Sequence, residues 1–263
     1  MVIFNEREYI KNIIEEHDSK KNRRIRTLIK QLIKYYYTEY KNAPTKDYVQ
    51  KILETIETFE YDDVVYREFM YYDYIKKTCK KAQKGEFNTY LRELEFIDVT
   101  EAELAVVSKG KNNREKKLLF TLYVLAKMFQ YHSGWVNYPP SEIFKLANVS
   151  LKYEDRFLLI HELYKAGLIQ LNHIIGKTGY KVELHEDSPT AVTVTLNKAF
   201  GNQYMAYIKG KDWTVCQECG RLVKKNSNHD FSTKYCKRCA EKIHNMQKIA
   251  FQTKKRKKNE DKA

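Results

Sequence analysis

The sequence predicts a mainly α-helical protein with a small α+β part. Only 9 Gly and 4 Pro occur in 263 residues, so long helices are rarely interrupted. Two Cys-x-x-Cys pairs near the C-terminus predict a small metal-centred module. Together these features divide the chain into a helical domain (1–90), a middle domain (99–200), a four-cysteine finger with a basic helix (211–258) and a disordered tail (259–263).

The helical N-terminal domain is predicted from apolar residues that recur every three or four positions. Residues 23–40 carry such a stripe over four turns. Pro44 separates this helix from a second one, and a third is expected over residues 62–83. Residues 85–98 are expected to connect this domain to the next. The second helix has its apolar side chains on one face: Val49, Ile52, Leu53, Ile56 and Phe59.

A short helix is expected near the start of the middle domain, where the Thr-x-x-Glu pattern from Thr100 to Glu103 has the form of a capping box. The order of elements that follows is typical of a winged helix-turn-helix. An unspecialised small α+β domain is the alternative. The expected elements are a helix (114–131), a strand (135–136), a helix opened by Pro139 and Pro140, a turn (148–150), a helix (153–166) and two strands (168–172 and 181–196).

The four cysteines predict one structural zinc ion. Cys216 and Cys219 form the first pair, and Cys236 and Cys239 form the second. Four thiolates at this spacing complete a tetrahedral site and leave no position for water, so the metal would fold the module rather than catalyse. Redox-active or disulfide-bonded cysteines are the alternative.

A finger of treble-clef or ribbon type is expected around this site. Leu222 and Val223 are expected to pair with residues 233–235, and the second Cys pair is expected to open the terminal helix. His229 and His244 are less favoured as ligands because four cysteines already complete the site. The fifth cysteine, Cys79, has no partner in sequence and is predicted to be a buried thiol.

Positive charge is concentrated at the C-terminus. The net charge is +14, and residues 211–263 carry 15 Lys or Arg against 6 Asp or Glu. Such a concentration favours polyanionic partners, and double-stranded DNA is the favoured one. The residues expected to contact phosphates are Lys237, Arg238, Lys242, Lys248, Lys254, Lys255, Arg256, Lys257 and Lys258.

The middle domain gives a weaker signal for nucleic acid. Lys152, Tyr153 and Arg156 at the start of its third helix, with Lys177 and Lys181 in the wing, are its candidate contacts. Glu154 and Asp155 make the helix nearly neutral. A role in protein binding or in forming a homodimer is therefore equally open.

No catalytic residue is predicted, and the chain is expected not to be an enzyme. It has no Gly-rich phosphate loop, no Gly-x-Ser-x-Gly and no His-Glu-x-x-His. The carboxylate pairs Asp62/Asp63 and Glu93/Glu95 could bind Mg²⁺, as in nucleases, but no lysine or strand pattern surrounds them. The longest apolar stretch, residues 118–126, is too short to cross a bilayer, so no membrane association is expected.

Three short sequence segments and the finger resemble uncharacterised proteins of phages and mobile elements of Gram-positive bacteria. The segments are residues 116–127 (KKLLFTLYVLAK), 142–150 (EIFKLANVS) and 165–169 (KAGLI), and the resemblance spans roughly residues 25–245. It implies a phage or mobile-element protein in the cytoplasm of a bacterial host. The expected function is that of a zinc-containing DNA-binding protein in transcription regulation or replication. An adaptor or inhibitor that binds a host or defence protein, and an RNA-binding factor, are the alternatives.

Overall fold

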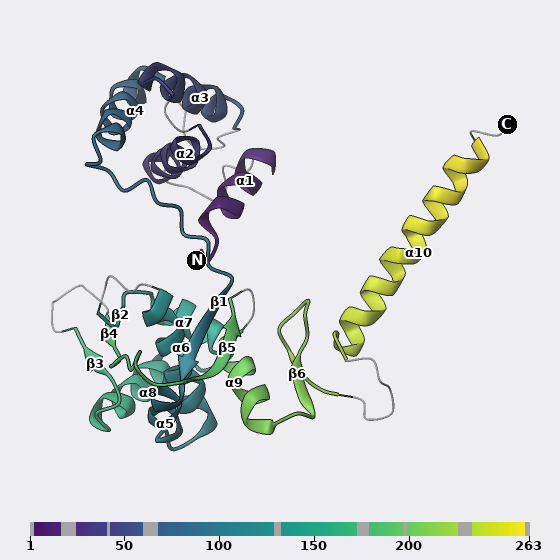
Figure 1. Cartoon of the computed structure of the whole chain (residues 1–263). Coiled ribbons are helices and arrows are strands. Elements are labelled where there is room, and N and C mark those ends of the chain that lie inside the picture. The colour runs from purple at the N-terminus through teal and green to yellow at the C-terminus, as the bar shows by residue number, and fades with distance from the viewer. Residues whose placement is uncertain are drawn as a thin grey trace. The chain divides into compact units, whose positions relative to one another are not determined.

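The computed structural model of the chain is mainly helical, with three small sheets among the residues it describes (Figure 1). These residues are 3–16, 25–40, 43–59, 68–128, 133–172, 179–196, 199–225 and 233–260, with backbone alone for 68–70 and 254–260. The chain from Ile3 onward divides into two units. The first is Ile3–Glu95 and the second is Phe96–Ala263. The division into three domains and a tail stays a prediction.

In the described part of the N-terminal unit there are four helices: α1 (Glu6–Glu16), α2 (Ile25–Glu39), α3 (Thr45–Glu57) and α4 (Glu68–Gln83). The apolar stripe predicted for the second helix is buried, from Val49 to Ile56 on α3 and at Phe59 just beyond its end. It packs with Leu28, Ile29, Leu32 and Ile33 of α2. The two helices therefore bury the faces that their periodicity indicates.

The two ends of this unit meet in a short backbone pairing. Asn5 forms an antiparallel bridge with Glu93, and the Glu6 amide donates to the Arg92 carbonyl at 2.7 Å. The Arg7 guanidinium binds Glu93 at 2.8 Å and Glu39 of α2 at 2.6 Å. Part of the segment predicted as a connector is thus packed into the unit.

Cys79 of α4 is a free, buried thiol, as predicted. Its side chain is 1% exposed, and burial raises its pKa to about 12. A thiol of this kind stays protonated and behaves as a small apolar side chain.

The second unit is built around α6 (Asn113–Met128), whose residues from Leu118 to Ala126 are all buried. Next to it lie β2 (Trp135–Val136), α7 (Pro140–Leu146) and α8 (Tyr153–Lys165). The strands β3 (Gln170–Leu171) and β4 (Tyr180–Lys181) join β2 in an antiparallel sheet with the order β2-β4-β3.

A second sheet corrects two expectations. The predicted strand over residues 181–196 is interrupted, because residues 182–189 leave the sheet before β5 (Thr190–Thr195) begins. β5 pairs antiparallel with β1 (Phe96–Thr100), which lies partly inside the predicted connector. The predicted capping box is present: Thr100 and Glu103 exchange their hydrogen bonds at the start of α5 (Glu101–Ser108).

Helix α9 (Phe200–Lys209) packs on α6, and the rings of Tyr204 and Phe120 lie 5.1 Å apart. Gly201 permits a close approach of α9 to the end of α7, because a Cβ there would stand 1.9 Å from the Ala147 carbonyl oxygen. The rest of the unit is β6 (Trp213–Val215), β7 (Leu222–Lys224) and α10 (Lys237–Glu260). In the part of the chain that the structure describes, no helix is both long and apolar enough to cross a membrane.

Candidate metal centre

The four predicted cysteines come together in space. Their sulfur atoms all lie within 4.8 Å of one another, and none forms a disulfide. A zinc–sulfur bond of about 2.3 Å places tetrahedral sulfurs about 3.8 Å apart. The Cys219 and Cys236 sulfurs lie 3.7 Å apart. The cluster thus has the dimensions of a four-coordinate metal site.

The first pair sits in the turn between β6 and β7. The Cys216 amide donates to the Arg221 carbonyl at 2.8 Å, and the Gly220 amide donates to the Cys216 carbonyl at 2.9 Å. Gly220 has a φ of +66°, a backbone conformation that glycine adopts without a steric penalty. This tight turn directs both sulfurs to one side.

The second pair lies at the start of α10. The Cys236 carbonyl accepts the Ala240 amide at 2.9 Å, so Cys236 immediately precedes the helix and Cys239 lies in its first turn. The positive end of the helix dipole favours thiolates at these positions. The Gln217 amide donates to the Lys234 carbonyl at 2.8 Å and joins the two pairs.

The donor set is suited to a cation. Burial alone would raise the pKa of Cys216, but backbone amides directed at its sulfur lower that pKa to about 6. At Cys239, burial and then the adjacent sulfurs raise the pKa to about 12. The first thiolate therefore forms readily, and its negative charge disfavours deprotonation of the neighbouring thiols. A bound dication offsets this repulsion. Among the described residues, no other group of three or more His, Cys, Asp or Glu side chains could hold a metal ion.

Side-chain amides connect this site to the middle of the unit. The Asn202 amide of α9 donates to the Gly220 carbonyl at 2.8 Å, and its oxygen accepts the Asn148 amide at 2.8 Å. Asn148 lies in the turn between α7 and α8 with a φ of +50°. The sequence alone does not single out Asn202, because an Asn within a helix carries no signal that distinguishes a buried hydrogen-bonding bridge from a solvated side chain.

Comparison of the chain with protein-family models, with curated proteins and with solved structures gave no match.

The prediction for the hairpin of the finger is wrong about which segment pairs with Leu222 and Val223. Leu222 and Val223 pair with Val215 and Thr214 of β6, whereas residues 233–235 form no strand. The strand that pairs with β7 thus precedes the first Cys pair in sequence, whereas the predicted partner follows β7. His244 lies on the exposed surface of α10, and His229 lies outside the described residues.

The basic residues predicted to bind phosphates lie mainly along α10. Lys237, Arg238, Lys242 and Lys248 are exposed on this helix, next to the cysteine cluster. The backbone of α10 continues through residues 254–258 and ends at Glu260, inside the predicted tail. The whole helix carries nine Lys or Arg against two Glu.

The candidate contacts in the middle domain lie on α8 and β4 where the structure describes them. Lys152 and Tyr153 are exposed at the start of α8. Arg156 braces its own turn, since its Nε donates to the Leu151 carbonyl at 3.1 Å and its guanidinium lies 5.8 Å from the centre of the Phe144 ring. Lys181 is half-buried in β4, and Lys177 lies outside the described residues. Of the carboxylates considered for Mg²⁺, Glu93 is paired with Arg7, and Asp62 and Asp63 also lie outside the described residues.

Proposed function

We propose that this chain is a zinc-containing DNA-binding protein of phage or mobile-element type, acting in transcription regulation or replication. The observation that carries the proposal is the cysteine cluster at the start of a basic 24-residue helix. A metal at that cluster would fix the helix relative to the finger. Exposed Lys and Arg along it would then contact backbone phosphates, whatever the base sequence.

Zinc is the metal that best fits the cluster. Four thiolates in a closed site suit a soft dication without redox chemistry. The cysteines Cys216, Cys219, Cys236 and Cys239 would hold one ion, and its role would be structural. A treble-clef or ribbon type of finger is an interpretation supported by the knuckle turn and by the second pair opening a helix.

A winged helix-turn-helix is the interpretation of the middle domain that its element order favours. The order α6, β2, α7, α8, β3, β4 and the sheet order β2-β4-β3 are those expected of that fold. In this reading α8 would be the helix that reads bases or mediates a homodimer contact.

Fluorescence anisotropy with the zinc-loaded full chain tests DNA binding. We expect binding to random duplex DNA at ~50 mM salt, with a steep fall in affinity as salt rises. The double variant Lys242→Gln/Lys248→Gln should reduce the slope of log K against log salt by about 2. The variant Lys80→Gln/Lys81→Gln makes the same charge change on exposed residues of α4 and should leave the slope unchanged.

The proposal is wrong if the chain binds no duplex at ~50 mM salt. Equal slopes for wild type and the α10 variant would remove α10 from the interface. A preference for single-stranded RNA in the same assay would favour the RNA-binding alternative.

A protein-binding adaptor or inhibitor is the second candidate, and the surface of α8 favours it. Tyr153, Phe157 and Leu158 are exposed on this helix, with Tyr153 71% exposed. Glu154 and Asp155 stand beside them and offset the charges of Lys152 and Arg156, so the surface is aromatic and nearly neutral rather than basic. Such a surface has no net positive charge to attract phosphate and suits a protein partner. A stoichiometric host protein that co-purifies after nuclease treatment would support this candidate, and a partner lost with nuclease would remove it.

A further inference from the structure

Beyond its first two turns, helix α10 is exposed on all sides. Cys236 and Cys239 are buried where the helix starts and Ile243 is half-buried, but every residue from 244 to 253 is exposed. Helices in folded proteins are stabilised mainly by burying one face, and a helix that buries none is marginal in water. The exposed length of α10 is therefore a surface available to a partner outside the chain.

One side of this exposed length is apolar. The side chains on this side are spaced three or four positions apart and are Ile243, Met246, Ile249, Ala250 and Thr253. Met246 is 61% exposed and Ile249 is 63% exposed. The Thr253 hydroxyl donates to the Ile249 carbonyl at 3.0 Å, so its polar group is already paired within the helix. Phe251, 70% exposed, extends the apolar surface further around the helix.

The other side of α10 is polar and basic. Lys237 and Lys248 lie on the side opposite Met246. Over its whole length the helix carries nine Lys or Arg against two Glu. A helix with one apolar side and a large excess of Lys and Arg is typical of segments that lie at an anionic membrane surface.

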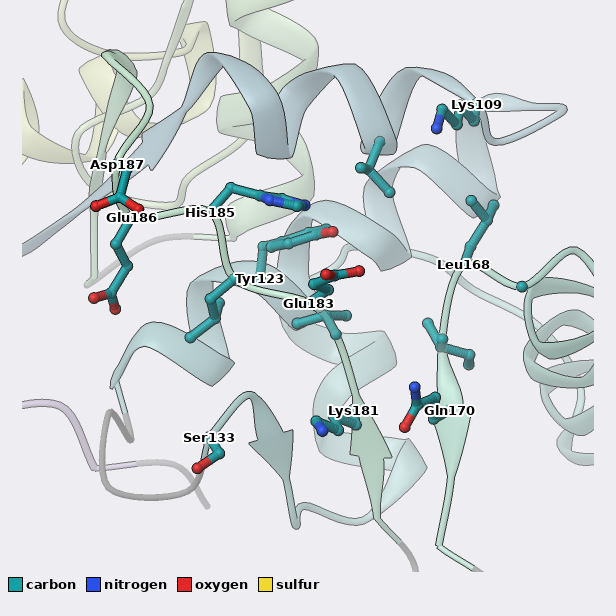
Figure 2. Close-up of a pocket in the computed structure, with 15 residues that line it drawn as sticks. Lys109, Tyr123, Ser133, Leu168, Gln170, Lys181, Glu183, His185, Glu186 and Asp187 are labelled. Carbon is teal, nitrogen blue, oxygen red and sulfur yellow. The ribbon is translucent and has the colours of Figure 1, made fainter.

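A groove of about 770 Å³ in the same unit shows the contrast (Figure 2). Lys109 and Lys181 line it together with Glu183, Glu186 and Asp187. Charges of both signs therefore surround this groove, and they select neither an anionic nor a cationic partner. On α10 one sign of charge dominates, so the sign of its partner is determined.

Charge and exposed apolar area together select the partner of α10. A second copy of the helix would bring its own excess of positive charge and would be repelled. DNA phosphates would neutralise the basic side chains but would leave Met246 and Ile249 in water. An acidic groove on a protein takes a narrow stripe of a helix, whereas the apolar side chains from Ile249 through Met246 to Phe251 reach about halfway around α10. A membrane surface supplies anionic phosphates and covers half of a helix that lies along it.

We propose that α10 binds the surface of a membrane that contains anionic lipids. Met246, Ile249 and Phe251 insert at the boundary between headgroups and acyl chains, and the Lys and Arg residues contact lipid phosphates. Such a helix lies along the surface and does not need the apolar span that crossing a bilayer requires. The basic residues are shared with the proposed DNA interface, so DNA and anionic lipid compete for α10.

Flotation of the zinc-loaded full chain with vesicles tests the proposal. We expect partition onto phosphatidylcholine vesicles with about 40% phosphatidylglycerol, and at least roughly 10-fold weaker partition onto phosphatidylcholine alone. The double variant Ile249→Gln/Phe251→Gln keeps every charge of the helix. It should weaken partition about 30-fold, because two large apolar side chains no longer enter the bilayer.

Leu158→Gln is the matched control, because Leu158 on α8 is 62% exposed and the substitution makes the same chemical change. It should alter partition less than about 2-fold, since α8 does not carry the basic residues that draw α10 to the membrane. DNA binding separates this proposal from the proposed function. Ile249→Gln/Phe251→Gln should leave the salt slope of DNA binding unchanged, because counterion release depends on charge.

The proposal is overturned if the chain does not partition onto the anionic vesicles. It is also overturned if Ile249→Gln/Phe251→Gln partitions as well as wild type, or if Leu158→Gln weakens partition equally. Without vesicle binding, self-association that this double variant abolishes would assign the apolar side of α10 to a second copy of the chain. An acidic protein captured by wild type and not by the double variant would assign it to a protein groove. Unfolding midpoints establish that all variants are folded.

Discussion

Asn202 joins the finger to the middle of the second unit through one side-chain amide. The side chain is buried, and its two hydrogen bonds reach Gly220 and Asn148. Asn202→Ala would leave the buried Gly220 carbonyl without a partner and would remove one hydrogen bond of the exposed Asn148 side chain, so we expect a loss of about 2 kcal/mol in the free energy of unfolding. Chemical denaturation measures it. Asn245→Ala, on the exposed surface of α10, is the control and should cost less than about 0.5 kcal/mol.

Glu103 is a second residue with several buried partners. Its carboxylate accepts the Thr100 and His185 amides and pairs with Lys127 Nζ at 2.9 Å. The carboxylate is fully buried and the Lys127 side chain is 10% exposed, so removing one charge strands the other. We expect Glu103→Gln to lower the free energy of unfolding by about 3 kcal/mol.

An exposed ion pair provides the comparison for Glu103. Glu15 stands 3.7 Å from Lys11 on α1, with both side chains 60% exposed. Glu15→Gln should cost less than about 0.5 kcal/mol in the same denaturation experiment. A similar cost for both variants would mean that Lys127 reaches water when its partner is lost.

At the scale of elements, the four cysteines of the cluster and the buried thiol of α4 should differ in their reactivity toward a thiol reagent. We expect no rapid reaction of the zinc-loaded chain with a thiol reagent at pH 8. After chelation four thiols should react, and Cys79 should react only after unfolding, because its pKa is about 12 and its side chain is buried.

Metal analysis of two serine variants completes this experiment. Cys219→Ser should lower the zinc content from about one ion per chain to near zero, whereas Cys79→Ser should leave it unchanged. Zinc retained in Cys219→Ser would mean that the cluster is not the binding site. Rapid reaction of five thiols after chelation would mean that the N-terminal unit depends on the metal.

The elements also show what could be predicted from local sequence. Helix α3, the capping box at Thr100 and the metal-ligand spacing each depend on residues within a few positions of one another, and the structure has all three. Strand pairing depends on distant partners, and it was there that prediction failed. The alternation of Ile97 and Val99 could have indicated β1, but nothing in the local pattern names β5 as its partner.

At the scale of the whole molecule, the two units should respond differently to loss of the metal. Chelation should increase amide hydrogen exchange in β6, β7 and the first turns of α10, which the cluster holds together. Exchange in α2 and α3 should not change, because their buried residues pack in the core of the other unit. Hydrogen-exchange mass spectrometry separates these peptides. Equal increases in both units would show that they unfold cooperatively.

The pairing of β1 with β5 has a consequence for synthesis of the chain. Phe96 pairs with Thr195, so β1 cannot form its sheet until the ribosome has added about a hundred further residues. At roughly 5–20 residues per second, the ribosome takes on the order of 5–20 s to supply them. The N-terminal unit closes earlier, since Asn5 needs only Glu93. Translation therefore releases a finished helical unit first and leaves a β-strand exposed for seconds, the interval in which a nascent chain is most open to chaperones.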